Sequence, residues 1–244
     1  LAARELGLPL DQPEDVNAPD ARARIAAGQP DLLVLCAFGA LLRERLLAAH
    51  EIVNVHPSLL PRWRGAAPIE RAIMVGDERT GVSIMRLTEG LDDGPVCLAE
   101  PEAVAADDTF GSLSPRLEDL GGRLLGRALD ERPPWRAQPE EGVTYAERIA
   151  PEERTLAPAR PPVVNERVVR ALHPHIGARV RLADGSFLGV LRAAVVDDRP
   201  DGLEARGGRL LLGGLELLEV QPAGGRPMPA ADFLRGRGEG TRQL

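Results

Sequence analysis

The chain has no lysine, two cysteines and no long apolar run. All 30 of its basic residues are arginine, a bias of composition to which no mechanism is attached. A helix that crosses a membrane needs about 18 or more consecutive apolar residues, and no stretch of the 244 residues reaches that length. Cys36 and Cys97 lie in separate apolar, strand-like stretches, which predicts buried, reduced thiols without a disulfide. The composition therefore predicts a soluble, globular protein of the cytoplasm.

Charge is distributed unevenly along the chain. The net charge of −7 at pH 7 argues weakly against a nucleic-acid partner. Residues 1–150 hold 16 Arg and 25 acidic residues, a balance of −9, whereas residues 151–244 hold 14 Arg and 12 acidic residues, a balance of +2. A nucleic-acid site needs a local basic face rather than a basic chain, so the second half of the sequence is the better place for one.

Strands and helices alternate over the first 130 residues. The apolar run at residues 30–38 follows a helical stretch at 20–27, a pattern typical of a strand buried on both faces of a parallel sheet. Further helices are expected at 41–48, 66–75 and 109–129, and further strands at 51–56, 81–87 and 96–104. The alternation predicts a Rossmann-like α/β domain.

The character of the sequence changes near Glu131. A Pro-rich polar stretch at 132–141 is typical of a linker. A helix is expected at 165–172, followed by short strands at 178–182, 187–196, 209–212 and 215–220. Regularly spaced short strands favour a small, OB-like β-barrel. The predicted organisation is a catalytic domain at 1–131, a linker at 132–150, the OB-like domain at 151–238 and a tail at 239–244.

The most informative segment runs from Asn54 to Ala72 and reads N-V-H-P-S-L-L-P-R-W-R-G-A-A-P-I-E-R-A. Residues two apart on a strand face the same side, so Asn54 and His56 are expected side by side at the carboxyl end of a strand, where open α/β sheets hold ligands. The later stretch T-G-V-S-I-M-R-L, followed by G-L-D-D-G-P-V, places Asp92 at another junction of strand and loop. An amide, an imidazole and a carboxylate that converge on one rim predict a catalytic site.

These stretches resemble the methionyl-tRNA formyltransferases, a family within the folate-dependent formyltransferases. The resemblance extends over nearly the whole chain. It includes L-G-L-P-L-D-Q-P-E-D-V near the start and L-L-E-V-Q-P-A-G-G-R-P-M-P-A-A-D-F-L-R-G near the end. The Asn-x-His…Asp signature is common to the superfamily, whereas the stretch from Trp63 to Ile69 and the last run narrow it to the tRNA enzymes.

The resemblance implies transfer of a formyl group from 10-formyltetrahydrofolate to the amino group of methionyl-initiator tRNA, for translation initiation. In that reaction His56 accepts the amine proton and Asn54 donates a hydrogen bond to the formyl oxygen. Asp92 orients His56 and raises its pKa. The family pattern G-L-D-x-G selects Asp92 over its neighbour Asp93.

The resemblance also implies ligand contacts around this centre. Ser58, Leu59, Leu60 and Pro61 match the S-L-L-P loop that lines the folate pocket, where leucines and backbone groups form a small-ligand site. Arg62 and Arg64 are candidates for contact with tRNA or substrate phosphates. No metal is expected, because His173 and His175 flank a proline in a turn and have no further ligands at suitable spacing. A monomer is expected.

The start of the sequence departs from the family pattern. The usual first strand with its G-T-P-x-F-A-like motif, and the helix, strand and mobile loop after it, are not in this sequence; together they form a βαβ unit of roughly 50–60 residues. We therefore expect the strand at 31–36, or its neighbour, to lack a partner on one side and to expose side chains such as Leu33 and Leu35. That edge is expected to lower stability and favour aggregation.

Two further functions are open at this point. One is a related formyltransferase that acts on an amino-sugar nucleotide or a small amine. The other is an inactive, truncated fragment that serves as a binding module.

Overall fold

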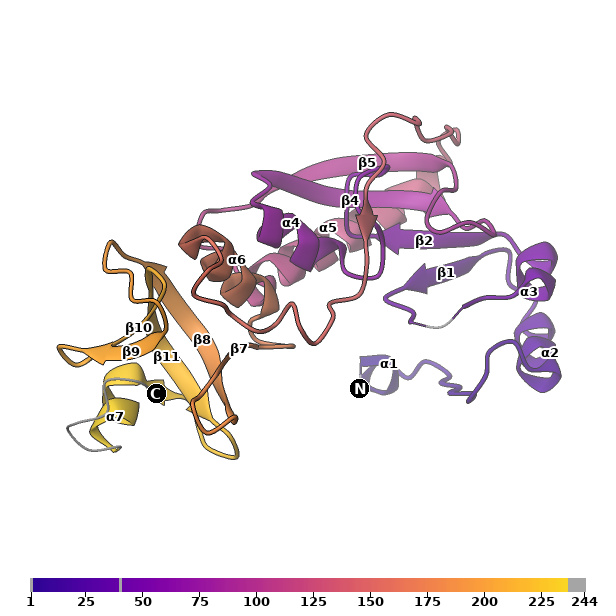
Figure 1. Ribbon diagram of the computed structural model, residues 1–244. Coiled ribbons are helices and arrows are strands. Elements are labelled where there is room, and N and C mark those ends of the chain that lie inside the picture. The colour runs from indigo at the N-terminus through magenta and orange to yellow at the C-terminus, as the bar shows by residue number, and fades with distance from the viewer. Residues whose placement is uncertain (1, 40, 237–244) are drawn as a thin grey trace.

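The computed structural model describes residues 2–39 and 41–236. Figure 1 shows an α/β half beside a smaller half made mainly of curled strands. The helices of the first half are α1 (Ala2–Glu5), α2 (Pro19–Ala27), α3 (Glu44–Ala49), α4 (Pro68–Val75) and α5 (Phe110–Glu131). The predicted fold class, a Rossmann-like α/β domain followed by a small β domain, is confirmed.

The first sheet has four strands in the order β1 (Leu33–Cys36), β2 (Ile52–His56), β4 (Arg79–Arg86) and β5 (Val96–Ala103). Strands β1 and β2 are parallel, whereas β4 runs antiparallel to both β2 and β5. The expectation of a parallel sheet is therefore wrong for two of the three strand pairs. Alternation of strands and helices along the chain does not distinguish a connection that crosses over the sheet from one that turns back.

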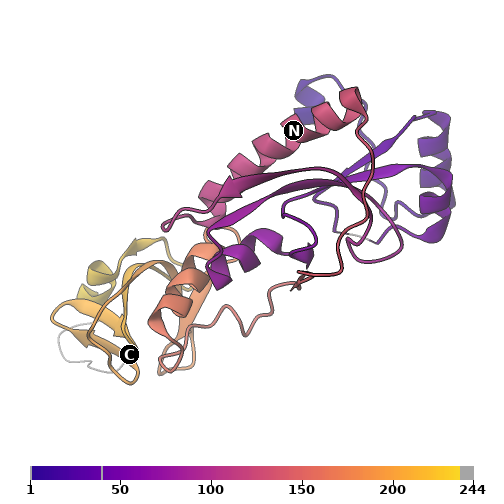
Figure 2. The same ribbon diagram turned by 90° about the horizontal axis from the view of Figure 1, so that it is seen from above.

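Helix α5 covers one face of this sheet (Figure 2). Thr109 and Ser112 form its capping box, in which each side chain bonds the backbone N–H of the other residue. Leucines recur every three or four residues on its buried stripe, as an amphipathic helix requires. They and their partners on β2 and β4 are Leu113, Leu117, Leu120, Leu124, Val53, Val82 and Ile84. At Gly121 the helix lies so close to the sheet that a Cβ would be 2.8 Å from Cγ1 of Val55.

Strand β1 lies at the end of the sheet order, with β2 as its neighbour. Val34 pairs with Val53 and so shares its face, but α5 packs chiefly on β4 and β5, and Val34 is 46% exposed. Leu33 and Leu35, on the other face, are half-buried, so the expectation that they would be exposed is wrong. The expectation of a buried thiol at Cys36 is wrong as well, because Cys36 shares the exposed face of Val34; Cys97 is half-buried, and both thiols are free.

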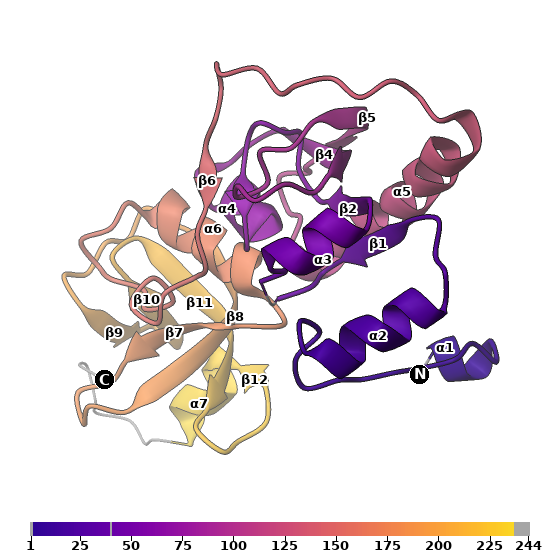
Figure 3. The same ribbon diagram turned by 90° about the vertical axis from the view of Figure 1, so that its right-hand side faces the viewer.

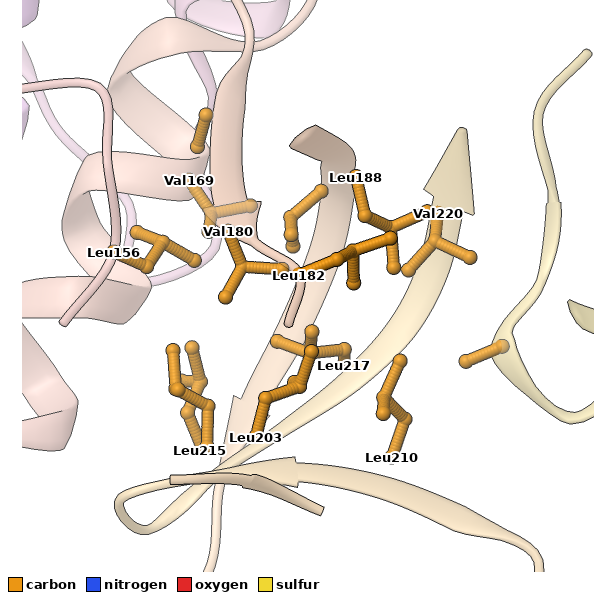
Figure 4. Close-up of a cluster of buried hydrophobic side chains, with 14 of the residues drawn as sticks. Leu156, Val169, Val180, Leu182, Leu188, Leu203, Leu210, Leu215, Leu217 and Val220 are labelled. Atoms are coloured by element: carbon orange, nitrogen blue, oxygen red, sulfur yellow. The ribbon is translucent and has the colours of Figure 1, made fainter. Parts of the chain in front are cut away.

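The second sheet is antiparallel, with strand order β7-β8-β11-β10-β9 and β12 paired to β11. Its strands are β7 (Ala178–Arg181), β8 (Phe187–Val195), β9 (Leu203–Arg206), β10 (Arg209–Leu212), β11 (Leu215–Pro222) and β12 (Met228–Pro229). The sheet curls into a half-barrel, and the side chains on its inner face form a leucine- and valine-rich core with α6 (Pro162–Leu172) and α7 (Ala230–Arg235) (Figure 4). The predicted small β domain is confirmed; β9, the strand L-E-A-R, was not among the predicted strands.

Helix α6 joins the two halves. Val169 and Leu172 pack into the core of the β half, while Ala171 packs into the core under α5. Arg167 donates to the carbonyl oxygen of Val75 at 2.9 Å, which ties α6 to the end of α4.

The domain boundaries stay predictions, and the predicted tail at 239–244 lies outside the described residues. Within the described part of the chain, no helix combines the length and the apolar character needed to cross a membrane.

Two adjacent glycines of α5 provide a test of this packing. Gly121→Ala would overpack the contact with Val55, so we expect the free energy of unfolding to fall by about 1–3 kcal/mol. The better helix propensity of alanine offsets part of this loss. Gly122→Ala points into open space and should raise it by up to about 1 kcal/mol. Urea denaturation of both variants measures the difference, and equal effects would contradict the close approach.

Candidate functional site

Strand β2 has a polar face and an apolar face. Val53 and Val55 lie on the side of α5, so the alternating residues Ile52, Asn54 and His56 face the opposite side. Asn54 is 8% exposed and His56 is 3% exposed. The predicted side-by-side placement of the amide and the imidazole at the carboxyl end of a strand is confirmed by this geometry.

Asp92 reaches these two side chains by a different route from the one predicted. Because β4 is antiparallel to β2, with Arg86 paired to Val53, the carboxyl end of β4 lies beside the beginning of β2. The loop at 87–95 brings Asp92 back to the carboxyl end of β2. There its Oδ2 lies 3.7 Å from Nδ1 of His56, and Nδ2 of Asn54 donates to its Oδ1 at 3.5 Å. The backbone N–H of Gly65 donates to Oδ2 at 2.9 Å.

The structure separates the two adjacent aspartates. The Asp93 carboxylate accepts a hydrogen bond from the Thr88 hydroxyl within its own loop, whereas Asp92 faces His56. The backbone of Asp92 has φ 47°, in the left-handed region that most residues avoid and Asp tolerates. Asp93 therefore stabilises the turn, and Asp92 is the carboxylate that lies beside the imidazole.

A backbone carbonyl determines the tautomer of His56. Its Nε2 lies 2.9 Å from the carbonyl oxygen of Trp63, and a carbonyl oxygen only accepts, so Nε2 carries a proton. In the neutral ring Nδ1 is then the basic nitrogen, on the side of Asp92. Trp63 itself has φ 62°, and its indole Nε1 donates to Oδ2 of Asp77 at 2.8 Å, which holds the residue in this strained conformation.

Burial lowers the pKa of His56 below its usual value of 6.5, because the charged imidazolium loses its hydration. The Asp92 carboxylate and the bond to Trp63 act in the opposite direction and raise it. The expected upward influence of Asp92 is present, but burial outweighs it. His56 is therefore neutral at neutral pH and has a carboxylate nearby to stabilise its charged form.

The predicted folate loop follows directly on His56. Ser58 is fully buried; its hydroxyl donates to the carbonyl oxygen of Arg62, and its own carbonyl oxygen accepts from the hydroxyl of Ser83. The Ser58 side chain thus holds the loop together. Leu59, Leu60 and Pro61 are half-buried, which leaves them as the part of the loop suited to line a ligand.

The two candidate arginines are both held by protein partners. Arg62 makes two bonds to the carboxylate of Asp77, at 2.9 and 2.7 Å, and its guanidinium lies 4.4 Å from the ring centroid of Trp63. Arg64 makes two bonds to Oε1 of Gln138, at 3.0 and 2.8 Å. These bonds hold both guanidinium groups against neighbouring parts of the protein.

Sequence reasoning missed the contribution of the segment after α5. Figure 3 shows it arching past β5 and returning as β6 (Tyr145–Ala146) beside α4. There β6 pairs in parallel with β3 (Arg64–Gly65), and Thr144 Oγ1 accepts from the backbone N–H of Trp63. The local sequence R-P-P-W-R-A-Q-P-E-E contains no motif for this role, because the role comes from pairing with residues far away in the chain.

His173 and His175 lie in the turn after α6, and His175 bonds to α4. Nε2 of His175 is 2.9 Å from Oε1 of Glu70, and its ring stacks on Phe110 at a centroid distance of 3.6 Å. Over residues 2–39 and 41–236, no group of three or more His, Cys, Asp or Glu residues is placed to hold a metal ion. His175 instead connects the turn after α6 to α4.

The sequence of the chain is similar to those of known proteins. Residues 9–129 match the formyl transferase family. The chain is 43% identical over 256 residues to the methionyl-tRNA formyltransferase of Halorhodospira halophila, and the match covers 97% of this chain and 80% of that relative.

Two solved structures share the fold. The methionyl-tRNA formyltransferase from Clostridium thermocellum is similar with a TM-score of 0.65 and 16% identity, over 86% of this chain and 88% of that chain. HypX from Aquifex aeolicus, in complex with tetrahydrofolic acid, is similar with a TM-score of 0.69 and 17% identity, over 93% of this chain and 42% of that chain.

The lowered pKa of His56 predicts a pH dependence of stability. As the pH falls below 6.5, His56 of the unfolded chain binds a proton. In the folded protein His56 binds this proton only when the pH reaches its lower, folded-state pKa. Over that window the free energy of unfolding should fall by at most about 1.4 kcal/mol per pH unit from this group. His56→Gln, which keeps a donor for the Trp63 carbonyl, should flatten the dependence in urea unfolding between about pH 7 and 5. His50→Gln is the matched control, and an unchanged slope in the His56 variant would contradict the assignment.

Proposed function

The chain belongs to the methionyl-tRNA formyltransferase family, and we propose that Asn54, His56 and Asp92 carry its reaction. The reaction is transfer of the formyl group of 10-formyltetrahydrofolate to the amino group of methionyl-initiator tRNA. The observation that supports these roles most directly is the placement of His56, whose ring lies between the Trp63 carbonyl and the Asp92 carboxylate. We place the reaction in the cytoplasm and assign it to a monomer.

Formyl transfer has three chemical requirements. The amine must be uncharged to attack, so that its nitrogen forms a bond to the formyl carbon. The oxygen of the resulting tetrahedral intermediate carries negative charge that needs a hydrogen-bond donor or a cation. The bond between that carbon and the folate nitrogen then breaks, and the proton lost by the amine is transferred to this nitrogen.

His56 has the properties of the proton carrier. Its lowered pKa leaves Nδ1 unprotonated at neutral pH and ready to accept the proton of the amine. The imidazolium that forms has Asp92 Oδ2 at 3.7 Å, so the charge it gains is stabilised where it appears. The same ring then returns the proton to the leaving folate nitrogen. Burial and the carboxylate together keep both protonation states of the ring accessible.

Asn54 has the properties of the oxyanion donor. One N–H of its amide makes a long bond of 3.5 Å to Asp92, and an amide nitrogen has two N–H groups. We assign the second to the formyl oxygen, where a donor held by a rigid strand stabilises developing charge without reorganising. The position of Asn54 two residues before His56 on β2 keeps both groups on one face of the sheet.

The folate and tRNA contacts follow from the surroundings of this centre. We assign the pterin to the half-buried Leu59, Leu60 and Pro61, with Ser58 as the residue that holds their loop in place. Arg62 and Arg64, which follow this loop, are bonded to Asp77 and Gln138. We assign the tRNA to the second half of the chain, where arginines outnumber acidic residues by 14 to 12 over residues 151–244.

The alternatives have less support. A formyltransferase for an amino-sugar nucleotide or a small amine would share the central triad, but the 43% identity to a methionyl-tRNA formyltransferase over 97% of the chain favours the tRNA substrate. An inactive binding module would not require a buried histidine of lowered pKa facing a carboxylate. Formyl transfer to charged initiator tRNA, compared with transfer to an amino sugar nucleotide, distinguishes these functions.

Substitution of the two reacting side chains tests the roles. His56→Ala should slow formyl transfer by about a hundredfold or more, because a general acid–base group is lost. Asn54→Ala should cost a comparable factor, because the oxyanion loses a donor. Single-turnover formylation of methionyl-initiator tRNA at saturating folate donor measures both effects.

His173→Ala is the matched control for loss of a histidine, and it should retain the wild-type rate. Filter binding of the tRNA should be unaffected in all three variants, because neither role involves tRNA affinity. A rate within about threefold of wild type for His56→Ala or Asn54→Ala, far below the loss expected of such groups, would refute the assigned role.

A further inference from the structure

Gln138 connects the segment after α5 to the backbone of the Asp92 loop. Its Nε2 donates to the carbonyl oxygens of Asp92 and Gly94, each at 2.8 Å. Its Oε1 accepts both bonds from the guanidinium of Arg64. One carboxamide therefore bonds the two segments, 64–65 and 92–94, that surround the Asp92 carboxylate.

The register of the chain determines this placement. Val96, at the start of β5, and Arg136 form an antiparallel bridge in which each backbone N–H donates to the carbonyl of the other, at 2.8 and 3.0 Å. In an antiparallel pair, two residues forward on one segment lie opposite two residues back on the other. Gln138 is therefore held opposite Gly94.

The orientation of the Gln138 amide follows from donor and acceptor chemistry. The guanidinium of Arg64 has donors and no acceptor, so it requires the amide oxygen. The carbonyls of Asp92 and Gly94 only accept, so they require the amide nitrogen. A flipped amide would lose all four bonds, and Gln138 has one stable orientation in this environment.

The conformation of Asp92 explains why such support is needed. Its backbone is in the left-handed region, with φ 47°, which for a residue other than glycine persists where the surroundings hold it. The Asp92 side chain is 15% exposed and is held by the backbone N–H of Gly65 and the long bond from Asn54. The bonds from Gln138 hold the peptide groups on which this carboxylate depends.

We propose that Gln138 is a positioning residue, which holds the Asp92 carboxylate against His56 by clamping the backbone at residues 92–94. This inference rests on the proposed function for its effect on the rate. It extends that function by giving the stretch after α5 a part in the reaction. Gln138 itself acts through Asp92 and is not required to touch substrate.

Two substitutions separate its two sets of bonds. Gln138→Ala removes all of them. Gln138→Glu keeps an acceptor for Arg64 and loses both donors to the loop. The matched control is Gln221→Ala, because Gln221 likewise donates from Nε2 to a turn carbonyl, that of Gly225 at 2.9 Å, in the β half of the molecule.

The first measurement is steady-state kinetics of formyl transfer by the full chain. We expect kcat to fall about tenfold to a hundredfold in both Gln138 variants, the scale for a reacting group displaced by about an ångström. KM for the tRNA and for the folate donor should stay near wild type, and Gln221→Ala should match wild type throughout. Wild-type kcat in Gln138→Glu would mean that the bonds to the loop are dispensable, and a change confined to KM would mean substrate contact; either result overturns the proposal.

The second measurement does not depend on turnover. The chain has four histidines, and the imidazole signals of His56 can be assigned by their loss in His56→Gln and followed by NMR as the pH is changed. Because Asp92 raises the pKa of His56, release of the loop should move the titration midpoint of His56 to lower pH in Gln138→Ala, which adds no charge, while Gln221→Ala leaves it in place. An unchanged midpoint, or one moved to higher pH by entry of water, overturns the proposal.

The two measurements also separate this inference from the function on which it rests. If wild type transfers no formyl group to the tRNA but the His56 midpoint shifts as expected, the proposed function fails and the positioning role stands. If wild type is active and the midpoint does not move, the positioning role fails alone. Thermal unfolding of each variant confirms that the compared proteins are folded at the temperature of assay.

Discussion

The hydrogen bond from Nε2 of His56 to the carbonyl oxygen of Trp63 is the contact on which the arrangement of the site depends. It places the proton on one ring nitrogen and leaves the other as the base facing Asp92. The carbonyl can point there because Trp63 adopts a left-handed conformation, held by the bond between its indole and Asp77. A backbone group therefore determines which atom of a side chain does the chemistry.

Desolvation and charge act on His56 in opposite directions, and their balance suits a proton carrier. Burial in the sheet disfavours the imidazolium, while the carboxylate of Asp92 favours it. A histidine with burial alone would be a weak base, and one paired tightly with a carboxylate would stay charged and could not accept a proton. The distance of 3.7 Å between Nδ1 and Oδ2 is longer than a hydrogen bond. The carboxylate therefore stabilises the charged ring without keeping it permanently protonated.

The sequence predicted most of what local patterns encode. The two-residue spacing of Asn54 and His56 placed them together correctly, because alternation is a property of any strand. The prediction that Asp92 joins them rests on the wrong reason, a position at the carboxyl end of a neighbouring strand. Strand β4 is antiparallel to β2, and the loop after β4 folds back to bring Asp92 to His56. The apolar neighbours of Cys36 in the sequence predict a buried thiol. The thiol is exposed because α5 packs chiefly on β4 and β5 and does not cover β1. The contributions of Trp63 and Gln138 arise from a backbone carbonyl and from a long-range bridge, neither of which leaves a local signature.

The path of the chain after α5 has a consequence for how this protein can be divided. Composition places a border near residue 131, and a fragment ending there would still contain Asn54, His56 and Asp92. Such a fragment would lack the β6 strand that pairs with β3, including Ala146, whose carbonyl oxygen would be 2.8 Å from a Cβ placed on Gly65. The smallest unit that can be excised with an intact reaction centre therefore extends to about the end of β6, because the connecting segment is structurally part of the α/β half.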